Sequence, residues 1–305
     1  MDKENRGKNK MIYIEPHAGA TPIINLINSA HKQVSMEVYF VDDRPILQAL
    51  KRAHERGVNV QVIIDGKPYG MRSWKVKSEA RKLQKTGATV QYAPARFESG
   101  NGHWRFMHEK ATCTLHACEI GSANYGYDSF HRDRDFLYVT QKPDIVRAIN
   151  DVFNADWTGR RAGNYAHQVL VLSPGTSAGQ IVNVIDQPGP IEIESEEMGP
   201  FRETLDAIAA KGAQAHVILP ANISRTGQRD VDFLRQHGVQ VRLMPVHPLY
   251  DHSKTVITQT EVFIGSENFT RTSLESDREA GVITHNPHDI VKMKEQFAHD
   301  WATAQ

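Results

Sequence analysis

The chain has 305 residues, 40% of them hydrophobic, and its 36 lysine and arginine residues balance 36 aspartate and glutamate residues. This composition predicts a folded globular protein of one large or two ordinary domains, and the zero net charge excludes a global field that would draw the chain onto nucleic acid or an anionic membrane. No apolar run approaches the roughly 18 residues of a membrane span, and the polar start MDKENRGKNK lacks the apolar segment of a secretory signal. We therefore expect a soluble protein, cytoplasmic from the chain as given, and secreted or periplasmic if a signal peptide has been removed.

Helices and strands alternate along the first half. Apolar residues recur at helical spacing from Pro45 to Arg56, and Gly57 ends that predicted helix before the β-branched run VNVQVII. Another helix is predicted around Glu79 to Lys85. The second half repeats this order in FRETLDAIAAKGAQAHVIL and in a helix from Asp230 to Gln236. Such an order predicts an α/β fold with a mixed, largely parallel sheet covered by helices on both faces.

The two cysteines, Cys113 and Cys118, flank His116 in the pattern C-x2-H-x-C. The four residues between them place the cysteines on facing arms of a hairpin, as buried thiols or as a cross-strand bridge. Zinc needs a further ligand, and the second half has no matching cysteine or histidine. We expect packed thiols and no metal site. So few cysteines also exclude a disulfide framework and favour an intracellular setting.

The second half repeats polar residues of the first at a displacement of 144 positions. MHEKATCTLHACEIGSANYG aligns with DHSKTVITQTEVFIGSENFT, and DRD aligns with DRE further along. The repeated polar residues are His108, Lys110, Ser122, Asn124 and Asp135 in the first copy, and His252, Lys254, Ser266, Asn268 and Glu279 in the second. We predict two domains of one fold, residues 1–157 and 158–305, related by pseudo-twofold symmetry and joined near TGRRAGNYAHQ.

The repeated residues suit chemistry on a phosphodiester. In H-x-K on a strand, the histidine and lysine face the same side, and the G-S-x-N segment adds a hydroxyl and an amide close to them. Two such sets meeting at one site allow one imidazole to attack phosphorus while the other protonates the leaving alkoxide. The intermediate is a phosphohistidine, and the scheme needs neither a metal nor a cofactor. The lysines, serines and asparagines would hold the non-bridging oxygens.

A carboxylate is expected behind each imidazole, because an attacking histidine needs its second ring nitrogen held. Asp135 and Glu279 each lie 27 residues after the histidine of their own copy. We therefore predict that Asp135 supports His108 and that Glu279 supports His252. Since one chain carries both sets, a monomer suffices for a complete site.

These motifs resemble the phospholipase D superfamily, often called the HKD family, whose pattern is H-x-K-x4-D followed by G-S-x-N. The resemblance covers essentially the whole chain and implies two α/β/α domains, a metal-independent phosphodiesterase, and two catalytic histidines. By analogy with bacterial members, His108 is the nucleophile and His252 the acid. The family aspartate is replaced by Leu115 and Gln259, and we expect this loss to alter local support rather than chemistry.

The substrate is left open by the motifs. Our first hypothesis is hydrolysis or transfer of a phospholipid headgroup, with a nuclease second and a non-catalytic phosphate-binding module third. The first-copy insert RFESGNGHWRF offers Phe97, Trp104 and Phe106 for peripheral membrane contact, or else these rings pack under their own loop. The cationic run from Lys67 to Lys85 either contacts nucleic-acid phosphates or is the solvated face of an outer helix.

Overall fold

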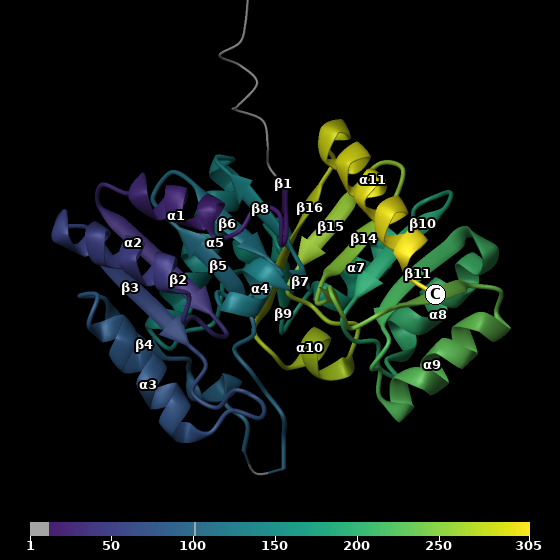
Figure 1. The fold of residues 1–305 in the computed structure, drawn as a ribbon, viewed down its shortest axis with the longest axis horizontal. Helices are drawn as coiled ribbons and strands as arrows, with labels where there is room; N and C mark the ends of the chain where they lie inside the picture. The colour runs from purple at the N-terminus through teal and green to yellow at the C-terminus, as the bar shows by residue number, and fades with distance from the viewer. Residues whose placement is uncertain (1–11, 101) are drawn as a thin grey trace, which may run out of the picture.

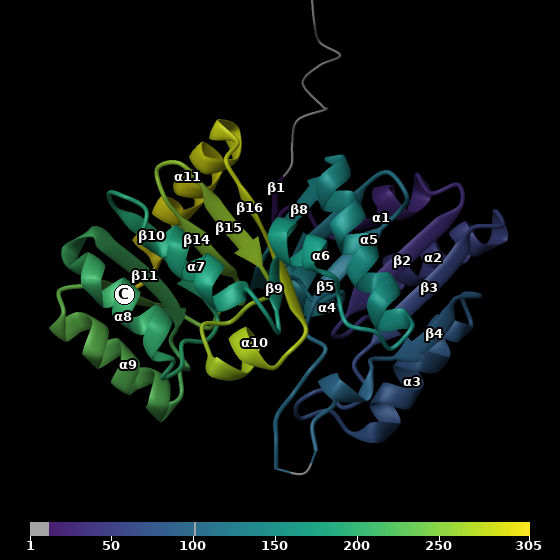
Figure 2. The same ribbon diagram turned by 180° about the vertical axis from the view of Figure 1, so that it is seen from behind.

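Two seven-stranded sheets form the frame of the protein, one in each half of the chain (Figure 1). The structure, a computed structural model, describes residues 12–100 and 102–305. The first sheet has the order β1-β8-β6-β5-β2-β3-β4 and the second the order β12-β11-β10-β14-β15-β16-β9. Helices cover these sheets on both faces (Figures 1 and 2). An α/β fold of two repeated halves is thereby confirmed.

The elements of the first half are β1 (Ile12–Ile14), α1 (Thr21–Asn28), β2 (Gln33–Val38), α2 (Arg44–Glu55), β3 (Asn59–Ile64), α3 (Ser73–Gln84), β4 (Thr89–Tyr92), the 3-10 turn η1 (Ala95–Phe97), β5 (Lys110–Cys113), β6 (Cys118–Gly121), α4 (Tyr127–His131), β7 (Asp133–Arg134), β8 (Phe136–Thr140) and α5 (Pro143–Trp157). Those of the second half are α6 (Asn164–Val169), β9 (Val171–Ser173), α7 (Ser177–Ile185), β10 (Ile191–Ser195), α8 (Arg202–Lys211), η2 (Gly212–Gln214), β11 (Ala215–Pro220), α9 (Arg225–Gln236), β12 (Gln240–Met244), β13 (Tyr250–Asp251), β14 (Lys254–Ile257), β15 (Val262–Gly265), α10 (Arg271–Glu275), β16 (Glu279–Thr284) and α11 (Pro287–Thr303).

The sheets are mixed, as expected, but their parallel part is smaller than the alternating pattern predicts. Only β2-β3-β4 and β10-β11-β12 pair in parallel, whereas the other strand pairs of both sheets are antiparallel. The reason is the H-x-K segment of each half, which forms a hairpin (β5-β6 and β14-β15) at the centre of its sheet. A two-strand hairpin runs antiparallel by construction, and it reverses the direction of the strands beyond it.

Strand register places one residue of each half beside the H-x-K motif. Val38 pairs with Lys110, and Ser195 pairs with Lys254. The next residues after β2 and β10 are Tyr39 and Glu196, whose amides donate to the backbone carbonyls of the residues between histidine and lysine, at 3.2 and 2.9 Å. The carboxyl ends of these two strands therefore lead directly to the motifs.

The halves are joined by pairing, by charge and by a shared core. Strands β7 and β13, one from each half, form a two-stranded parallel sheet. The buried Arg134 binds Asp300 of α11, with nitrogen to oxygen distances of 2.8 and 3.0 Å, and the buried Arg278 binds Asp156 of α5 at 2.6 and 3.2 Å. One hydrophobic cluster contains strand residues of both sheets. We keep 1–157 and 158–305 as a proposed division, which falls at the end of α5.

The two cysteines lie on facing arms of the β5-β6 hairpin. Cys113 and Cys118 form a disulfide across it, so the expectation of packed thiols is wrong and the cross-strand bridge is what the structure has. A disulfide leaves neither sulfur available to a metal, and His116 lies exposed on the turn. The hairpin register makes the bridge possible because it places the two residues directly opposite one another.

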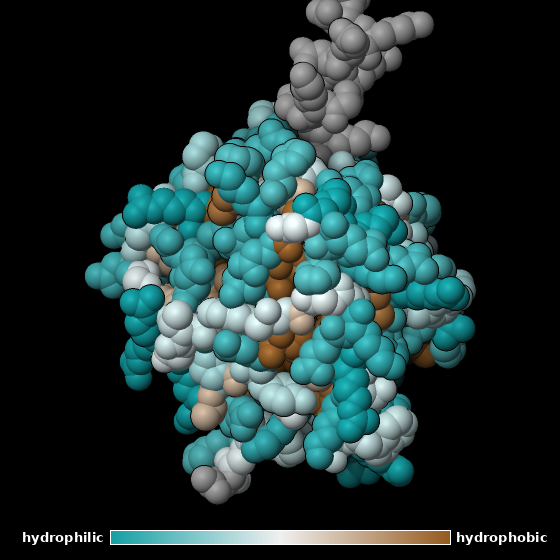
Figure 3. Space-filling view, turned by 90° about the vertical axis from the view of Figure 1, so that its left-hand side faces the viewer, coloured by the Kyte–Doolittle hydropathy of each residue, from teal (hydrophilic) through white to brown (hydrophobic). Residues whose placement is uncertain are grey.

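The outer surface of the first half is mainly hydrophilic. Figure 3 shows this side, on which hydrophobic residues emerge only in narrow patches. Helix α3 buries Val76, Ala80 and Leu83 and exposes its cationic residues, so this part of the lysine-rich run is the solvated face of an outer helix. Within residues 12–100 and 102–305, no helix has the length and apolar character needed to cross a bilayer.

Candidate active site

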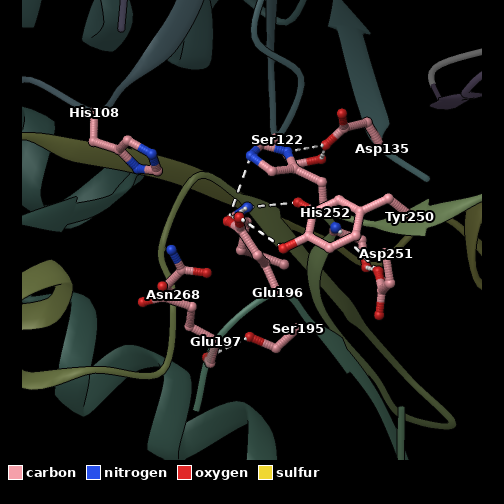
Figure 4. Close-up of polar contacts among 12 residues, drawn as sticks. His108, Ser122, Asp135, Ser195, Glu196, Glu197, Tyr250, Asp251, His252 and Asn268 are labelled. Atoms are coloured by element: carbon pink, nitrogen blue, oxygen red, sulfur yellow. Dashed lines mark hydrogen bonds and ion pairs between the residues drawn. The ribbon is translucent and has the colours of Figure 1, made fainter. Parts of the chain in front are cut away.

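One cavity of about 530 Å³ brings the two motif histidines together. It lies between the halves, and both His108 and His252 line it, which meets the central requirement of the two-histidine scheme. Figure 4 shows the His252 ring between Asp135 and Glu196, with His108 pointing toward the same space. The residues that line this catalytic cavity are Tyr39, Tyr69, Trp104, Phe106, His108, Asn124, Glu196, Glu197, His252, Asn268, Thr270, Thr272, Ser273, Asp277 and Glu279.

His108 is held so that its Nε2 faces the cavity. Its Nδ1 lies 3.0 Å from both carboxylate oxygens of Glu279, and its backbone amide donates to the carbonyl of Arg278 at 2.8 Å. The ring also packs edge-on against Tyr39, with centroids 4.7 Å apart. Burial lowers the pKa of His108 well below its usual value, and the cations of Lys110 and Lys254 lower it further. The imidazole is therefore neutral at neutral pH, with Nε2 as the nitrogen that carries a free lone pair.

His252 has the opposite electrostatic setting. Its Nδ1 lies 2.8 Å from Asp135, and its Nε2 lies 3.4 Å from Glu196. Burial disfavours the imidazolium, but the charges of Asp135 and Glu196 outweigh burial and raise the pKa of His252. Burial by itself would raise the pKa of Glu196. The charges of His252 and Lys254 outweigh this effect and hold the pKa of its carboxyl well below the usual range. His252 is therefore the better proton donor of the pair.

The supporting carboxylates cross between the halves. The sequence predicts that Asp135 supports His108 and that Glu279 supports His252, whereas the structure pairs Glu279 with His108 and Asp135 with His252. The predicted pairing within each copy is therefore wrong. The cause is the docking of the halves, in which the DRD and DRE segments each reach across the interface.

The lysines and serines of the motifs lie behind the cavity rather than on its wall. Lys110 and Lys254 are completely buried, and each donates from Nζ to the carbonyl of its own motif histidine at 2.5 Å. Burial lowers the pKa of Lys110 to about 7. Ser122 donates to Asp135 at 2.6 Å, so its hydroxyl holds the carboxylate instead of facing a ligand.

Ser266 is the counterpart of Ser122 and is also completely buried. Its hydroxyl accepts from the amide of Ala280 at 3.1 Å. Ser273 donates to Glu279 at 2.5 Å, and Ser266 also hydrogen-bonds this carboxyl group, as Ser122 does Asp135. Burial raises the pKa of Glu279 to about 7, although Lys110 and the bonds from Ser266 and Ser273 oppose the rise. The serines thus do not bind phosphate directly in this arrangement.

The two asparagines do reach the cavity. Asn124 and Asn268 both line it, and the buried Oδ1 of each has no hydrogen-bond partner in the part of the chain that the structure describes. Buried amides are almost always hydrogen-bonded in native proteins. The amide oxygen of each side chain is therefore an unpaired acceptor at the cavity wall.

Five further residues line the cavity that the sequence does not predict as site residues: Tyr39, Tyr69, Glu196, Glu197 and Asp277. Four of them differ between the copies or lack a motif, so a search for repeated letters passes over them. The available signal was positional, because Tyr39 and Glu196 follow the strands that precede a Gly-stopped helix in each half. Asp277 lies within the repeated DRE segment and was seen there without a role.

Leu115 and Gln259, which replace the family aspartate, lie in the turns of the two hairpins and not at the cavity. The preceding threonine supports each turn: Thr114 Oγ1 accepts from the amides of His116 and Ala117 at 3.2 and 3.1 Å. Thr258 Oγ1 does the same for residues 260 and 261. Each turn therefore keeps a side-chain acceptor although the aspartate is missing. The replacement of the family aspartate changes the hairpin turns and not the cavity.

A family model described as "Cardiolipin synthase, PLD-like domain" matches residues 23–157 and 193–301. A cardiolipin synthase from Clostridium perfringens is 32% identical over 134 residues, which cover 43% of this chain and 26% of that protein. A cardiolipin synthase from Listeria monocytogenes is 29% identical over 136 residues, again 26% of its length. The chain thus spans about a quarter of the length of these curated relatives.

Among solved structures, the phosphatidylserine synthase of Haemophilus influenzae superimposes with a TM-score of 0.70 at 14% identity, covering 98% of this chain and 88% of that one. The polyphosphate kinase of Porphyromonas gingivalis superimposes with a TM-score of 0.72 at 13% identity, covering 94% of this chain and 49% of that one. At such low identity these likenesses concern the fold alone.

Proposed function

The chain belongs to the phospholipase D-like family, and from this premise we propose that it is a phosphodiesterase that transfers or hydrolyses the phosphatidyl group of a phospholipid through a phosphohistidine. One observation carries the proposal: an imidazole from each half lines one cavity, and their surroundings shift the two pKa values in opposite directions. Pairs of titratable groups with opposed pKa shifts are the usual mark of an acid and a nucleophile or base.

In the first step, Nε2 of His108 attacks phosphorus and forms the N–P bond. Glu279 accepts the Nδ1 proton in a hydrogen bond, which orients the ring and stabilises the positive charge that develops on it. The P–O bond to the headgroup breaks, and His252 delivers its Nε2 proton to the departing alkoxide. Asp135 keeps the His252 ring in place through Nδ1.

In the second step, the neutral His252 takes a proton from an alcohol or from water. That oxygen attacks phosphorus, the N–P bond breaks, and His108 is regenerated while His252 is again charged. Asn124 and Asn268 donate from Nδ2 to the non-bridging oxygens, and the buried charge of Lys254 stabilises the phosphoryl group from behind; Lys110 adds its own charge below its pKa of about 7. No step of this scheme uses a metal ion.

The lining of the cavity favours a phospholipid over a nucleic acid. It contains the carboxyl groups of Glu196, Glu197 and Asp277 beside Glu279, and none of its described residues is a lysine or arginine. Burial raises the pKa of Asp277 to about 8 and that of Glu279 to about 7, whereas His252 and Lys254 lower the pKa of Glu196 and keep it ionised. The Glu196 carboxylate disfavours a polyanionic strand, and a headgroup with hydroxyl or ammonium groups would donate hydrogen bonds to these carboxyl groups. At the mouth, Tyr69 and Trp104 are 73% and 61% exposed, a setting that suits contact with a lipid interface.

The test is one panel of assays in EDTA. Purified protein is given phosphatidylcholine vesicles, phosphatidylglycerol vesicles or single-stranded DNA, and headgroup release, headgroup exchange and strand cleavage are measured. We expect activity on a phospholipid, its loss in His108→Ala, and a loss of about 10²–10⁴-fold in His252→Ala. His116→Ala is the matched control, since that histidine is exposed on a turn. Strand cleavage alone would replace the lipid proposal by a nuclease.

The roles of the two histidines are separated by a soluble aryl phosphodiester. An aryloxide leaves without a proton, so His252→Ala should still release the aryl alcohol in a first burst and accumulate the covalent adduct. His108→Ala should show no burst. Mass spectrometry at alkaline pH then finds the adduct on the peptide that contains His108, and an adduct on the His252 peptide would reverse the assignment.

A further inference from the structure

A second cavity of about 460 Å³ lies between the halves, apart from the catalytic cavity. Residues of the loop before β5, of the segment around α6 and β9, and of α10 enclose it. Figure 2 shows α6, β9 and α10 together near the centre of that face, with the long loop before β5 below them. The side chains that matter here are those of Arg96, Arg105, Arg161, His167, Glu275 and Arg278. We call it the arginine cavity.

The two cavities share their walls. In the segment 104–106, Trp104 and Phe106 line the catalytic cavity, while Arg105 lines the arginine cavity. After α10, Asp277 lines the catalytic cavity, while Ser276 and Arg278 line the other. Neighbouring residues of each segment thus line different cavities, so one thickness of backbone separates the sites there.

The arginine cavity carries excess positive charge. Arg96 and Arg278 share one carboxylate, that of Asp156. Arg105 and Arg161 are exposed, and no hydrogen bond or ion pair of either guanidinium occurs among the described residues. The one acid on the wall, Glu275, is already paired with Arg271 at 3.0 Å.

Hydrogen bonds and close packing fix the position of residues in the wall of the arginine cavity. Ser99 Oγ donates to the carbonyl of Arg105 at 2.8 Å and accepts from its amide at 3.1 Å, which fixes the backbone that carries this guanidinium. His167 lies against Gly175, where a Cβ would come within 2.4 Å of its Cε1, so only glycine leaves room for the ring. The buried Nδ1 of His167 has no partner among the described residues.

We propose that the arginine cavity is a second anion site, which binds a phosphoryl group separately from the catalytic cavity. Planar guanidinium groups match the oxygens of a phosphate with paired hydrogen bonds, and Arg105 and Arg161 have donors to spare. The ligand is a phosphate monoester or diester, either free in solution or in the headgroup of an anionic lipid. The site goes beyond the proposed function, because binding there needs no turnover.

The first experiment is calorimetric titration of the full chain with inorganic phosphate. Arg105→Gln/Arg161→Gln should weaken binding about tenfold or more, because charge-assisted hydrogen bonds are lost. Arg81→Gln/Arg225→Gln, which removes two exposed arginines from α3 and α9, is the matched control and should bind as the wild type does. Asn124→Ala/Asn268→Ala identifies any binding that belongs to the catalytic cavity, and thermal melts verify that each variant is folded.

The second arm separates the two sources of the phosphoryl group. Vesicles of phosphatidylcholine with and without phosphatidic acid are sedimented with each variant. Wild-type binding only to vesicles with phosphatidic acid, lost in Arg105→Gln/Arg161→Gln, identifies a headgroup, whereas tight binding of inorganic phosphate identifies a free ligand. The proposal is overturned if that variant and its control bind both probes equally. Turnover is assayed separately. A chain that binds phosphate in the arginine cavity but cleaves no lipid would contradict the proposed function and leave the second anion site supported.

Discussion

At the scale of single residues, the two motifs are alike but their neighbours are not. The Tyr39 ring packs against His108. The ammonium of Lys110 lies over the same ring, 5.2 Å from its centroid. Its counterpart Glu196 binds Lys254 at 2.8 Å and lies 3.4 Å from His252. A neutral aromatic ring adds no charge beside one imidazole, while a carboxylate favours the charged form of the other. Together with Asp135, which raises the pKa of His252 more than Glu196 does, this difference between the copies separates nucleophile from acid.

The pH dependence of activity tests that difference. Activity requires neutral His108, whose pKa is lowered, and protonated His252, whose pKa is raised. Activity should therefore rise as the pH increases through the pKa of His108, and it should fall as the pH increases further through the pKa of His252. Glu196→Gln removes a charge that raises this pKa, so the alkaline limb of the kcat/KM profile should move to lower pH. Glu197→Gln, also on the cavity wall but with a weaker charge interaction with His252, should move that limb less.

The aromatic residues at the mouth make a second prediction. The rings of Tyr69 and Trp104 have centroids 5.6 Å apart, and Trp104 stacks on Phe106 at 6.2 Å. Burying about 60 Å² of indole in a lipid interface contributes ~1.5 kcal/mol, or about tenfold in binding. Trp104→Ala should lower turnover of vesicles by that factor and leave turnover of a monomeric short-chain phospholipid unchanged.

A matched control exists for this variant. Trp74 is 60% exposed on α3 and lines no part of the catalytic cavity. Trp74→Ala should leave both substrates unaffected. Equal losses on vesicles and on monomers in Trp104→Ala would instead place the ring in contact with the headgroup.

At the scale of the elements, the features that the sequence could predict are those that occur in both copies. The hairpins and the His-Lys-Asn sets recur at one displacement, so their existence and convergence were predictable. Glu196 and Tyr39 were not, because the search that finds repeated letters hides the positions where the copies differ. The crossing of Asp135 and Glu279 was also beyond the sequence, since chain distance favours the nearer histidine and only docking of the halves decides the pairing.

The short segments after α4 and α10 each pair with the opposite half of the molecule. The backbone carbonyl of Arg134 accepts a hydrogen bond from the amide of His252 at 3.1 Å, and that of Arg278 accepts one from the amide of His108 at 2.8 Å. The guanidinium group of each arginine binds a helix of the opposite half. The residue that follows each arginine is the carboxylate that supports the same histidine. Position and orientation of each imidazole thus come from the other half of the molecule.

The buried ion pairs give a stability prediction. Both side chains of the Arg134–Asp300 pair are about 1% exposed. Asp300→Ala would leave a buried guanidinium without its carboxylate, and we expect a loss of about 3–5 kcal/mol in the free energy of unfolding, measured with urea. Arg134→Met/Asp300→Leu should recover most of that loss, because an apolar pair leaves no charge behind.

An exposed ion pair provides the control. Arg202 and Asp206 are bonded at 2.7 Å, but their side chains are 64% and 52% exposed. Asp206→Ala should therefore cost less than about 0.5 kcal/mol. A small effect of Asp300→Ala, comparable with that of Asp206→Ala, would show that the arginine is not held in the interface.

At the scale of the whole molecule, the two halves are built as one cooperative unit. A single hydrophobic cluster includes Ile120 and Tyr138 of the first sheet together with Ile264 and Val282 of the second. The interface also contains the β7-β13 pairing and two buried ion pairs. Unfolding one half would expose apolar surface and leave buried charges in the other. We therefore expect neither half to retain its stability alone.

Scanning calorimetry tests this coupling. We expect one transition, with a van't Hoff enthalpy equal to the calorimetric enthalpy, rather than the two transitions of independent domains. Asp300→Ala should lower the midpoint of that transition without splitting it, because the shared cluster still couples the halves. Catalytic activity should disappear over the same temperature range, since each histidine is held by the opposite half. Two resolved transitions in the wild type, with activity lost at the first, would mean that the crossed contacts position the site but contribute little to stability.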